Sequence, residues 1–177
     1  AAGDPNTPIA ADYYPACWNE GMYNGKLYAI PVAVDDRALL YNKDLLKRAG
    51  LVDTNGEAKP PSDWDELREY AKKLTEYDSE GRMTVLGFAP LYGNSWLYMY
   101  SWMNGGEFMT PDGRKCTMND QKNVEALQYI IALYDDGGGY DKVMAFQAGF
   151  QTDALDPFVQ GKVAMKIDGS WAVSWHL

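Results

Sequence analysis

The stretch from Asn24 to Gly50 constrains the fold most strongly, because it combines a turn signal with two apolar runs. Asn24 and Gly25 are typical of a two-residue hairpin turn, since both residues tolerate positive φ. The continuous apolar run Leu27–Val34 predicts a buried strand, interrupted at Pro31, which has no N–H to donate to a ladder. A second apolar run, Ala38–Tyr41, predicts another buried strand.

The two apolar runs are separated by three charged residues, Asp35, Asp36 and Arg37. Two buried strands joined by a charged step indicate a chain that leaves one packed layer and enters another. A carboxylate at such a crossing lies where two lobes meet, and clefts between lobes are where ligands bind. We therefore interpret Asp35 and Asp36 as cleft residues. The alternative is a solvated turn in which Arg37 pairs with a neighbouring acid.

The rest of the chain mixes helix and strand patterns, which predicts an α/β fold. Asn42 is expected to cap a helix over 43–49, and Ser62 a helix over 63–76 with a core stripe of Trp64, Leu67, Ala71 and Leu74. A helix over 120–135, capped by Asn119, carries the apolar stripe Val124, Leu127, Ile130, Ile131 and Tyr134. Further helices are predicted over 95–104 and 152–160 and from Trp171, strands over 84–89 and 162–167, and loops over 90–95 and 140–151.

Composition excludes several classes of function. The net charge of −9 argues against a nucleic-acid partner, which needs a basic footprint. One histidine and two cysteines without metal spacing argue against a zinc or haem site, and we expect no cofactor. No apolar run reaches the about 18 residues of a membrane helix. The sequence has no signal peptide and no initial Met, so we interpret it as a processed or excised piece.

Three segments place polar or aromatic side chains just beyond a predicted strand. They are Asp35–Arg37, Tyr92–Trp96 and Asp168–Trp171. Ligands of open α/β sheets bind outside the strand ends, so these segments are candidates for a binding rim. Carboxylates accept hydrogen bonds from vicinal hydroxyls, and an indole face covers the apolar side of a pyranose, which fits a sugar. The alternative for the aromatic residues is core packing.

Four segments in this order resemble a known family. Asn24–Leu46, Pro60–Leu67, Asn104–Gly106 and Gly161–Trp171 are similar to the extracellular solute-binding proteins of carbohydrate ABC importers, which include maltose-binding protein. The resemblance implies a type II periplasmic-binding-protein-like fold, here a small mixed sheet flanked by helices. It also implies that residues 1–36 are a remnant of the first lobe and 37–177 most of a truncated second lobe.

The resemblance also implies a site and partners. Asp35 matches a cleft glutamate, Trp171 matches a stacking tryptophan in a Gly-Pro-Trp turn whose proline is Ser170 here, and Tyr92–Trp96 matches an aromatic sugar contact. The family's Glu-Pro-Tyr pattern is missing, which leaves the sugar undefined. The expected partners are a carbohydrate and the transmembrane permease subunits of an ABC transporter, in the periplasm or outside the cell, with a membrane anchor in a missing N-terminal segment. Cys17 and Cys116 are expected to be free thiols. The predicted ligand-binding residues are Asp35, Asp36, Arg37, Tyr92, Asn94, Trp96 and Trp171.

The alternatives to a binding protein are a glycosidase and a protein-interaction domain. A glycosidase needs two carboxylates about 5–10 Å apart. Asp35 and Asp36 are adjacent, and on a strand they would point to opposite faces, so they form a poor catalytic pair. A protein-interaction domain would instead present its aromatic residues to a protein partner. We expect a binding protein and no enzymatic activity.

Overall fold

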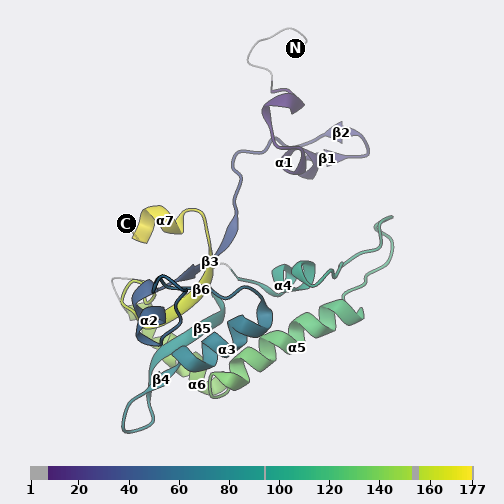
Figure 1. Cartoon of the computed structure of the whole chain (residues 1–177). Coiled ribbons are helices and arrows are strands. Elements are labelled where there is room, and N and C mark those ends of the chain that lie inside the picture. Colours follow the sequence, from purple (N-terminus) through teal and green to yellow (C-terminus); the bar gives the residue numbers. More distant parts are fainter. Residues whose placement is uncertain (1–7, 94, 153–155, 177) are drawn as a thin grey trace. The chain divides into compact units, whose positions relative to one another are not determined.

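The computed structural model describes residues 8–93, 95–152 and 156–176 (Figure 1). The chain divides into two compact units, Ala1–Asp36 (unit 1) and Arg37–Leu177 (unit 2). Over the described ranges, none of the helices combines the length and the apolar character that crossing a membrane requires.

Unit 1 consists of short elements beside a tight hairpin. A 3-10 turn, η1 (Ala10–Asp12), and helix α1 (Pro15–Glu20) precede strands β1 (Met22–Tyr23) and β2 (Lys26–Leu27), which pair antiparallel. Asn24 and Gly25 join the strands with φ of 47° and 72°, the left-handed backbone that a two-residue turn requires. The predicted hairpin is confirmed.

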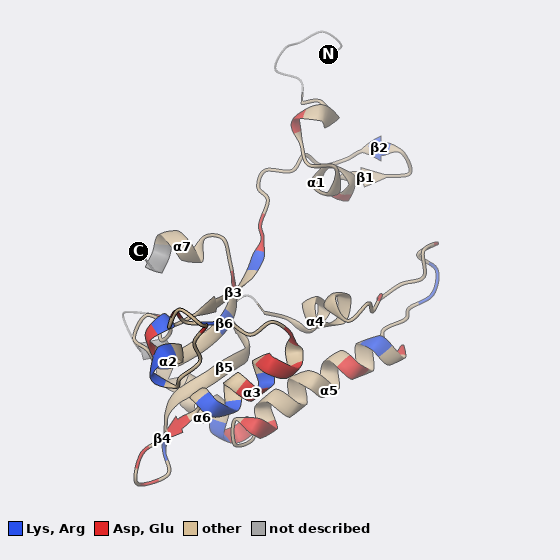
Figure 2. Cartoon of the chain, viewed as in Figure 1, with Lys and Arg blue, Asp and Glu red and all other residues tan. Residues whose placement is uncertain are grey.

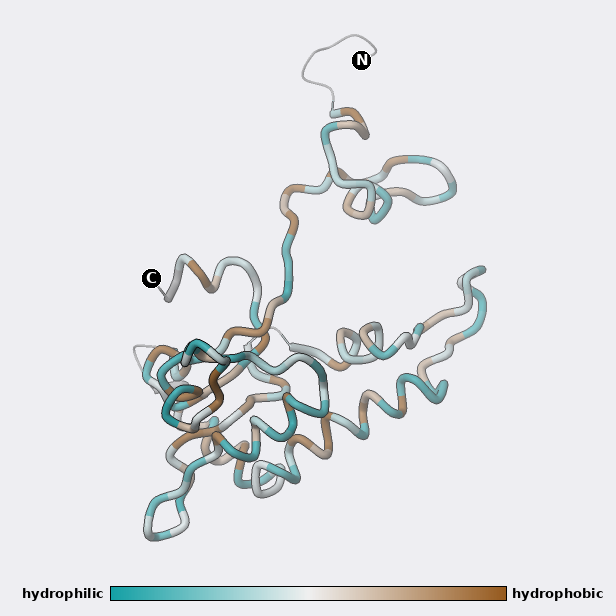
Figure 3. The backbone as a smooth tube through the Cα atoms, in the orientation of Figure 1, coloured by the Kyte–Doolittle hydropathy of each residue, from teal (hydrophilic) through white to brown (hydrophobic). Residues whose placement is uncertain are grey.

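The predicted buried strand over Leu27–Val34 is wrong. Residues 28–36 form no strand, and Val32 is 98% exposed, with Ile30 and Val34 also exposed. Figure 3 shows hydrophobic residues along this stretch. A continuous apolar run indicates a segment suited to burial, but burial needs a covering surface, which the described residues do not supply.

Unit 2 is built on a four-stranded mixed sheet in the order β3-β6-β5-β4. Strand β3 (Arg37–Tyr41) pairs antiparallel with β6 (Val163–Gly169), and β6 pairs parallel with β5 (Met83–Gly93). Strand β4 (Glu76–Tyr77) pairs antiparallel with β5. Every residue of β6 is buried, as expected for a central strand covered on both faces. The predicted small mixed sheet flanked by helices is confirmed.

The first two helices of unit 2 begin at capping side chains. Asn42 Oδ1 accepts hydrogen bonds from the N–H groups of Asp44 and Leu45 at 3.1 and 3.0 Å, so α2 (Lys43–Arg48) begins as predicted. Helix α3 (Trp64–Leu74) is capped by Asp63 rather than by Ser62, with Asp63 Oδ1 2.8 Å from the Glu66 nitrogen. Figure 2 shows acidic residues at the start of α3 and basic residues near its end, which suits the helix dipole.

Three later expectations need correction. Residues 140–148, expected in a loop, form helix α6 (Tyr140–Ala148), which starts after Gly139 at φ 100° and buries Val143. Residues 157–160, expected to be helical, form a turn, and residues 153–155 of that prediction lie outside the described part. Strand β5 continues to Gly93, so Tyr92 lies in the strand and not in the predicted loop.

Helix α5 (Gln121–Asp136) buries only part of the predicted stripe. The residue that precedes the helix is Asp120 and not the predicted cap Asn119. The predicted stripe included Val124, Leu127 and Ile131, which are 36%, 44% and 50% exposed. Ile130 and Tyr134 of that stripe are buried as predicted, together with Asn123, Ala126 and Leu133. Both faces carry apolar residues, and the face with the small Ala126 is the one that packs. The remaining helices are α4 (Leu97–Met103), a short 3-10 turn η2 (Gly149–Thr152) and α7 (Ala172–His176).

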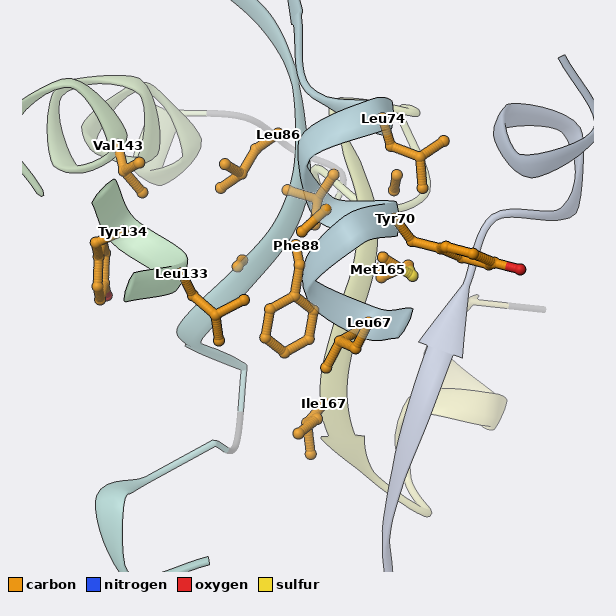
Figure 4. Packing of buried hydrophobic residues seen from close by; sticks show 14 of the residues in the cluster. Leu67, Tyr70, Leu74, Leu86, Phe88, Leu133, Tyr134, Val143, Met165 and Ile167 are labelled. Carbon is orange, nitrogen blue, oxygen red and sulfur yellow. The ribbon is translucent and has the colours of Figure 1, made fainter. Parts of the chain in front are cut away.

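The core of unit 2 joins α3 to the central strands (Figure 4). Leu67 and Leu74 of α3, Phe88 of β5 and Met165 of β6 are buried. Gly87 lets strand and helix approach closely, because a Cβ there would lie 2.7 Å from the Ala71 carbonyl carbon. The core thus fixes β5 and β6 against α3.

The topology brings three chain segments to one edge of the sheet. Since β5 and β6 are parallel, their carboxyl ends, at Gly93 and Gly169, lie at the same edge. Strand β3 runs the opposite way and starts there, with Arg37 paired to Gly169. We call this end of the three strands the carboxyl edge. It is where ligands of α/β sheets bind.

Candidate functional site

The carboxyl edge holds two neighbouring groups of side chains. Arg37 and Trp171 form the first, and Asp168, Lys166, Asp156 and Tyr92 form the second. Asp168 and Gly169 are consecutive in β6. The Asp168 side chain and the side of Gly169 that the Trp171 ring covers therefore lie on opposite faces of the sheet. The two groups therefore flank the last residues of β6.

Arg37 and Trp171 are in direct contact. The guanidinium carbon lies 4.9 Å from the centroid of the indole ring, within the range of a cation–π interaction. Arg37 is the first residue of β3, and Trp171 follows β6 by two residues. Both side chains are partly buried. The structure thus brings together two residues that the sequence analysis proposed as ligand contacts.

Gly169 makes room for the indole ring. A Cβ at this position would lie 2.6 Å from Cζ2 of Trp171, which is closer than non-bonded carbon atoms approach each other in proteins. The glycine is therefore required by the position of the ring and not by a positive φ. A larger residue at position 169 would move the indole away from the strand end.

The second group centres on a buried lysine. Lys166 is completely buried, and its ammonium lies 2.9 Å from Asp156 Oδ2 and 2.9 Å from Asp168 Oδ2. The side chains of Asp156 and Asp168 are 25% and 11% exposed, against 1% for Lys166. Two acids around one base leave this group with a net negative charge, and the carboxylates are the parts that reach the surface.

Tyr92 covers the lysine. Its ring centroid lies 5.7 Å from the Lys166 ammonium, and the Phe158 centroid lies 5.6 Å from it. Burial, followed by the charges of Asp156 and Asp168, raises the pKa of Tyr92 to about 12. The Tyr92 hydroxyl therefore keeps its proton at neutral pH and can donate a hydrogen bond.

The other predicted site residues are less closely placed. Trp96 precedes α4 and is 54% exposed. Asp35 and Asp36 belong to unit 1, where both side chains are exposed. Asn94 lies outside the described residues.

A pocket of about 230 Å³ opens beside Arg37 in unit 2. Its lining is mostly apolar, with polar groups from Arg37, Ser62 and Asp63. The apolar part includes Trp64, Tyr100 and Met103. A larger pocket of about 520 Å³ lies within unit 1 and is lined by residues 11–14, 17 and 31–34. It contains none of the predicted ligand-binding residues, so we give the pocket beside Arg37 more weight.

The sequence analysis missed the Lys166 group. A signal was present, because Lys166 interrupts the otherwise apolar run Val163–Ile167 and is followed two residues later by an acid. A charge in a central strand needs a buried partner. Among the described residues no group of His, Cys, Asp or Glu side chains has the arrangement of a metal site. Cys17 and Cys116 are free thiols.

Comparison with known proteins places the chain among binding proteins. A profile of the family described as bacterial extracellular solute-binding protein matches residues 1–175. A binding protein of Brucella abortus (strain 2308) is 31% identical over 146 residues, which are 82% of this chain and 33% of that protein. An arabinooligosaccharide-binding protein of Halalkalibacterium halodurans is 27% identical over 128 residues, which are 71% of this chain and 26% of that protein.

Solved structures agree with this result. The protein CpMnBP1 with mannobiose bound superposes with a TM-score of 0.79 at 30% identity, over 94% of this chain and 41% of that one. The chain thus spans about a third of the length of the Brucella relative and 41% of the mannobiose-bound structure. The expected type II periplasmic-binding-protein fold is confirmed by these neighbours.

Proposed function

The chain belongs to the bacterial extracellular solute-binding protein family, and we propose that the complete gene product is the substrate-binding component of an ABC transporter for a sugar or oligosaccharide. Relatives and neighbours with names that mention mannobiose or arabino-oligosaccharides support a carbohydrate as the ligand. The expected partners are the transmembrane permease subunits of that transporter. The expected location is the periplasm or the outer face of the membrane, held there by an N-terminal lipid anchor.

The observation that carries the proposal is the contact of Arg37 with Trp171 at the carboxyl edge. An indole offers a flat apolar surface for the C–H face of a pyranose, and a guanidinium offers five N–H donors for hydroxyl oxygens. The Arg37 guanidinium lies over one face of the ring, so a sugar would stack on the remaining indole surface, next to that polar donor. Carboxylates within the same edge supply acceptors for sugar hydroxyls.

We assign unit 1 to the first lobe and unit 2 to the second lobe of a two-lobed binding protein. The division of the chain between Asp36 and Arg37 supports this assignment. Ligand binding then shifts an equilibrium between open and closed lobes, and β3 is the segment that absorbs the rotation. Asp35, Asp36, Tyr92, Asn94 and Trp96 are proposed to contact the sugar together with Arg37 and Trp171.

The test is a glycan titration of the complete gene product. Intrinsic Trp fluorescence is recorded with mannobiose, maltose and arabino-oligosaccharides, with sorbitol as a control for non-specific effects of a polyol. We expect a saturable change with at least one glycan and none with sorbitol. Absence of any saturable response to the panel would contradict the proposal.

The same samples separate binding from catalysis. A binding protein returns the glycan intact, so chromatography after a long incubation is expected to show only the starting sugar. Hydrolysis products would favour a glycosidase. Binding of a protein from the same organism without any glycan response would favour an interaction domain.

A further inference from the structure

Burying the Lys166 ammonium in the centre of a sheet carries a large desolvation penalty. Lys166 is completely buried in β6, and an ammonium removed from water loses several kcal/mol of hydration that its partners must offset. Replacing a buried ion pair by apolar residues of similar size is often neutral or stabilising. The strand Val163–Ile167 is otherwise apolar, so apolar residues in place of Lys166 and of its two acidic partners together would be compatible with it. Stability is therefore a weak reason for the charge.

The geometry gives a better reason, because the ammonium fixes the orientation of Asp168. Asp168 Oδ2 lies 2.9 Å from Lys166 Nζ, and Asp168 Oδ1 accepts the N–H of Gly169 at 2.8 Å. Over the described residues these contacts give one partner to each oxygen, and a carboxylate has about four acceptor positions, so lone pairs remain. The carboxylate is thus held in one orientation at the carboxyl edge with acceptor capacity left.

The end of β5 packs closely on this carboxylate. Gly93 has φ 74°, and a Cβ there would lie 2.8 Å from the Ile167 carbonyl oxygen and 3.3 Å from Asp168 Oδ2. A side chain at position 93 would therefore press on the acid. The rings of Tyr92 and Phe158 cover the Lys166 ammonium, whereas 11% of the Asp168 side chain stays accessible to solvent.

We propose that Asp168 accepts a hydrogen bond from a hydroxyl of the bound sugar and that Lys166 is a positioning residue that holds the Asp168 carboxylate for this contact. The inference rests on the proposed function, because it names a further specificity-determining residue of the same edge. A fixed carboxylate selects a ligand with hydroxyl donors. It disfavours a ligand that carries a negative charge at that position.

The experiment compares variants of the complete gene product by calorimetric titration with the glycan of the mannobiose, maltose and arabino-oligosaccharide panel that binds best. Asp168→Asn keeps the shape of the side chain and removes its charge. A hydrogen bond to a charged group corresponds to a loss of about ten- to hundredfold in affinity. The matched control is Asp136→Asn, because Asp136 is also ion-paired and 16% exposed but bonds Arg68 between α3 and α5. It is expected to bind the glycan as the wild type does.

A series of monodeoxy derivatives of the same glycan separates contact from structure. In the wild type, one derivative is expected to lose affinity by the same factor as Asp168→Asn. In the Asp168→Asn variant that derivative and the parent glycan are expected to bind equally. Lys166→Met is expected to weaken binding less than Asp168→Asn, and the double variant no more than Asp168→Asn alone. Should Lys166→Met fail to fold, the monodeoxy series with Asp168→Asn decides the question.

The outcomes separate the two proposals. Unchanged affinity of Asp168→Asn, or a uniform loss across all monodeoxy derivatives, would overturn the role of Asp168 while leaving the proposed function intact. Absence of glycan binding by the wild type would overturn the proposed function and this inference with it.

Discussion

The guanidinium of Arg37 lies over the indole ring of Trp171, with its central carbon 4.9 Å from the ring centroid. Arg37 opens β3, and Trp171 follows the end of β6, so the contact ties the start of one strand to the turn after its partner. A cation–π pair at such a partly exposed position contributes about 0.5–1 kcal/mol. Its larger consequence is positional, because it orients a flat apolar surface at the carboxyl edge.

Gly169→Ala is predicted to move the Trp171 ring without unfolding the protein. The new Cβ would lie 2.6 Å from Cζ2, and a ring at the end of a partly exposed side chain can swing aside. We expect a changed Trp emission spectrum and a fall in glycan affinity of up to about tenfold. Thermal unfolding is the second readout, and the control is Gly149→Ala, where a Cβ meets no atom within 4 Å. Wild-type emission and affinity in Gly169→Ala would refute the positioning of the ring.

Gly87→Ala is predicted to destabilise unit 2 by about 1–3 kcal/mol through overpacking. Here the obstacle is backbone, since the Cβ would lie 2.7 Å from the carbonyl carbon and 2.9 Å from the Cα of Ala71 in α3. Strand and helix must separate to admit it. Urea unfolding measures the loss, again with Gly149→Ala as the control. Equal unfolding midpoints for Gly87→Ala and the control would show that α3 does not pack on β5 as described.

Glu66 is predicted to make stability depend on pH. Hydrogen bonds from Lys59, and then from Ser62, lower the pKa of Glu66 from 4.5 to about 2. A carboxyl group with a lower pKa in the folded state stabilises that state above its unfolded value, and the contribution is lost as pH falls through the folded value. The window is therefore pH 4.5 down to about 2. We expect the difference in melting temperature between wild type and Glu66→Gln to shrink across this window. A constant difference would contradict the lowered pKa.

Local patterns predicted elements of both units. The correct predictions, each of which depends on only a few residues, are the Asn24-Gly25 turn of unit 1, the Asn42 cap and the apolar run of β6. The cap of α3 was misplaced by one residue, because Ser62 and Asp63 are both good capping residues and only the position of Glu66 decides between them. The type II fold followed from the order of four segments, which is a property of the whole chain.

The predictions failed where tertiary contacts decide which residues are buried. Helix α5 has two apolar faces, and periodicity alone cannot say which face packs against the core. The face that carries Ala126 is buried, and Leu127 is left 44% exposed. The apolar run of unit 1 has no cover among the described residues, so it forms no strand. Within the site, Arg37 and Trp171 were each predicted as ligand-binding residues, but their mutual contact was not predicted. The Lys166 group was missed, because its partner Asp156 comes from a segment expected to be helical.

The most direct test of a sugar site at the carboxyl edge is fluorine NMR of the complete gene product labelled with 5-fluorotryptophan. Each resonance is assigned with a Trp→Phe variant, and the sample is titrated with the best-binding glycan of the panel. Trp171 is expected to shift saturably, whereas Trp102, which packs on Tyr98 with centroids 5.0 Å apart and does not line the pocket beside Arg37, is expected to stay fixed. Saturable binding that shifts Trp102 and leaves Trp171 unchanged would contradict the site.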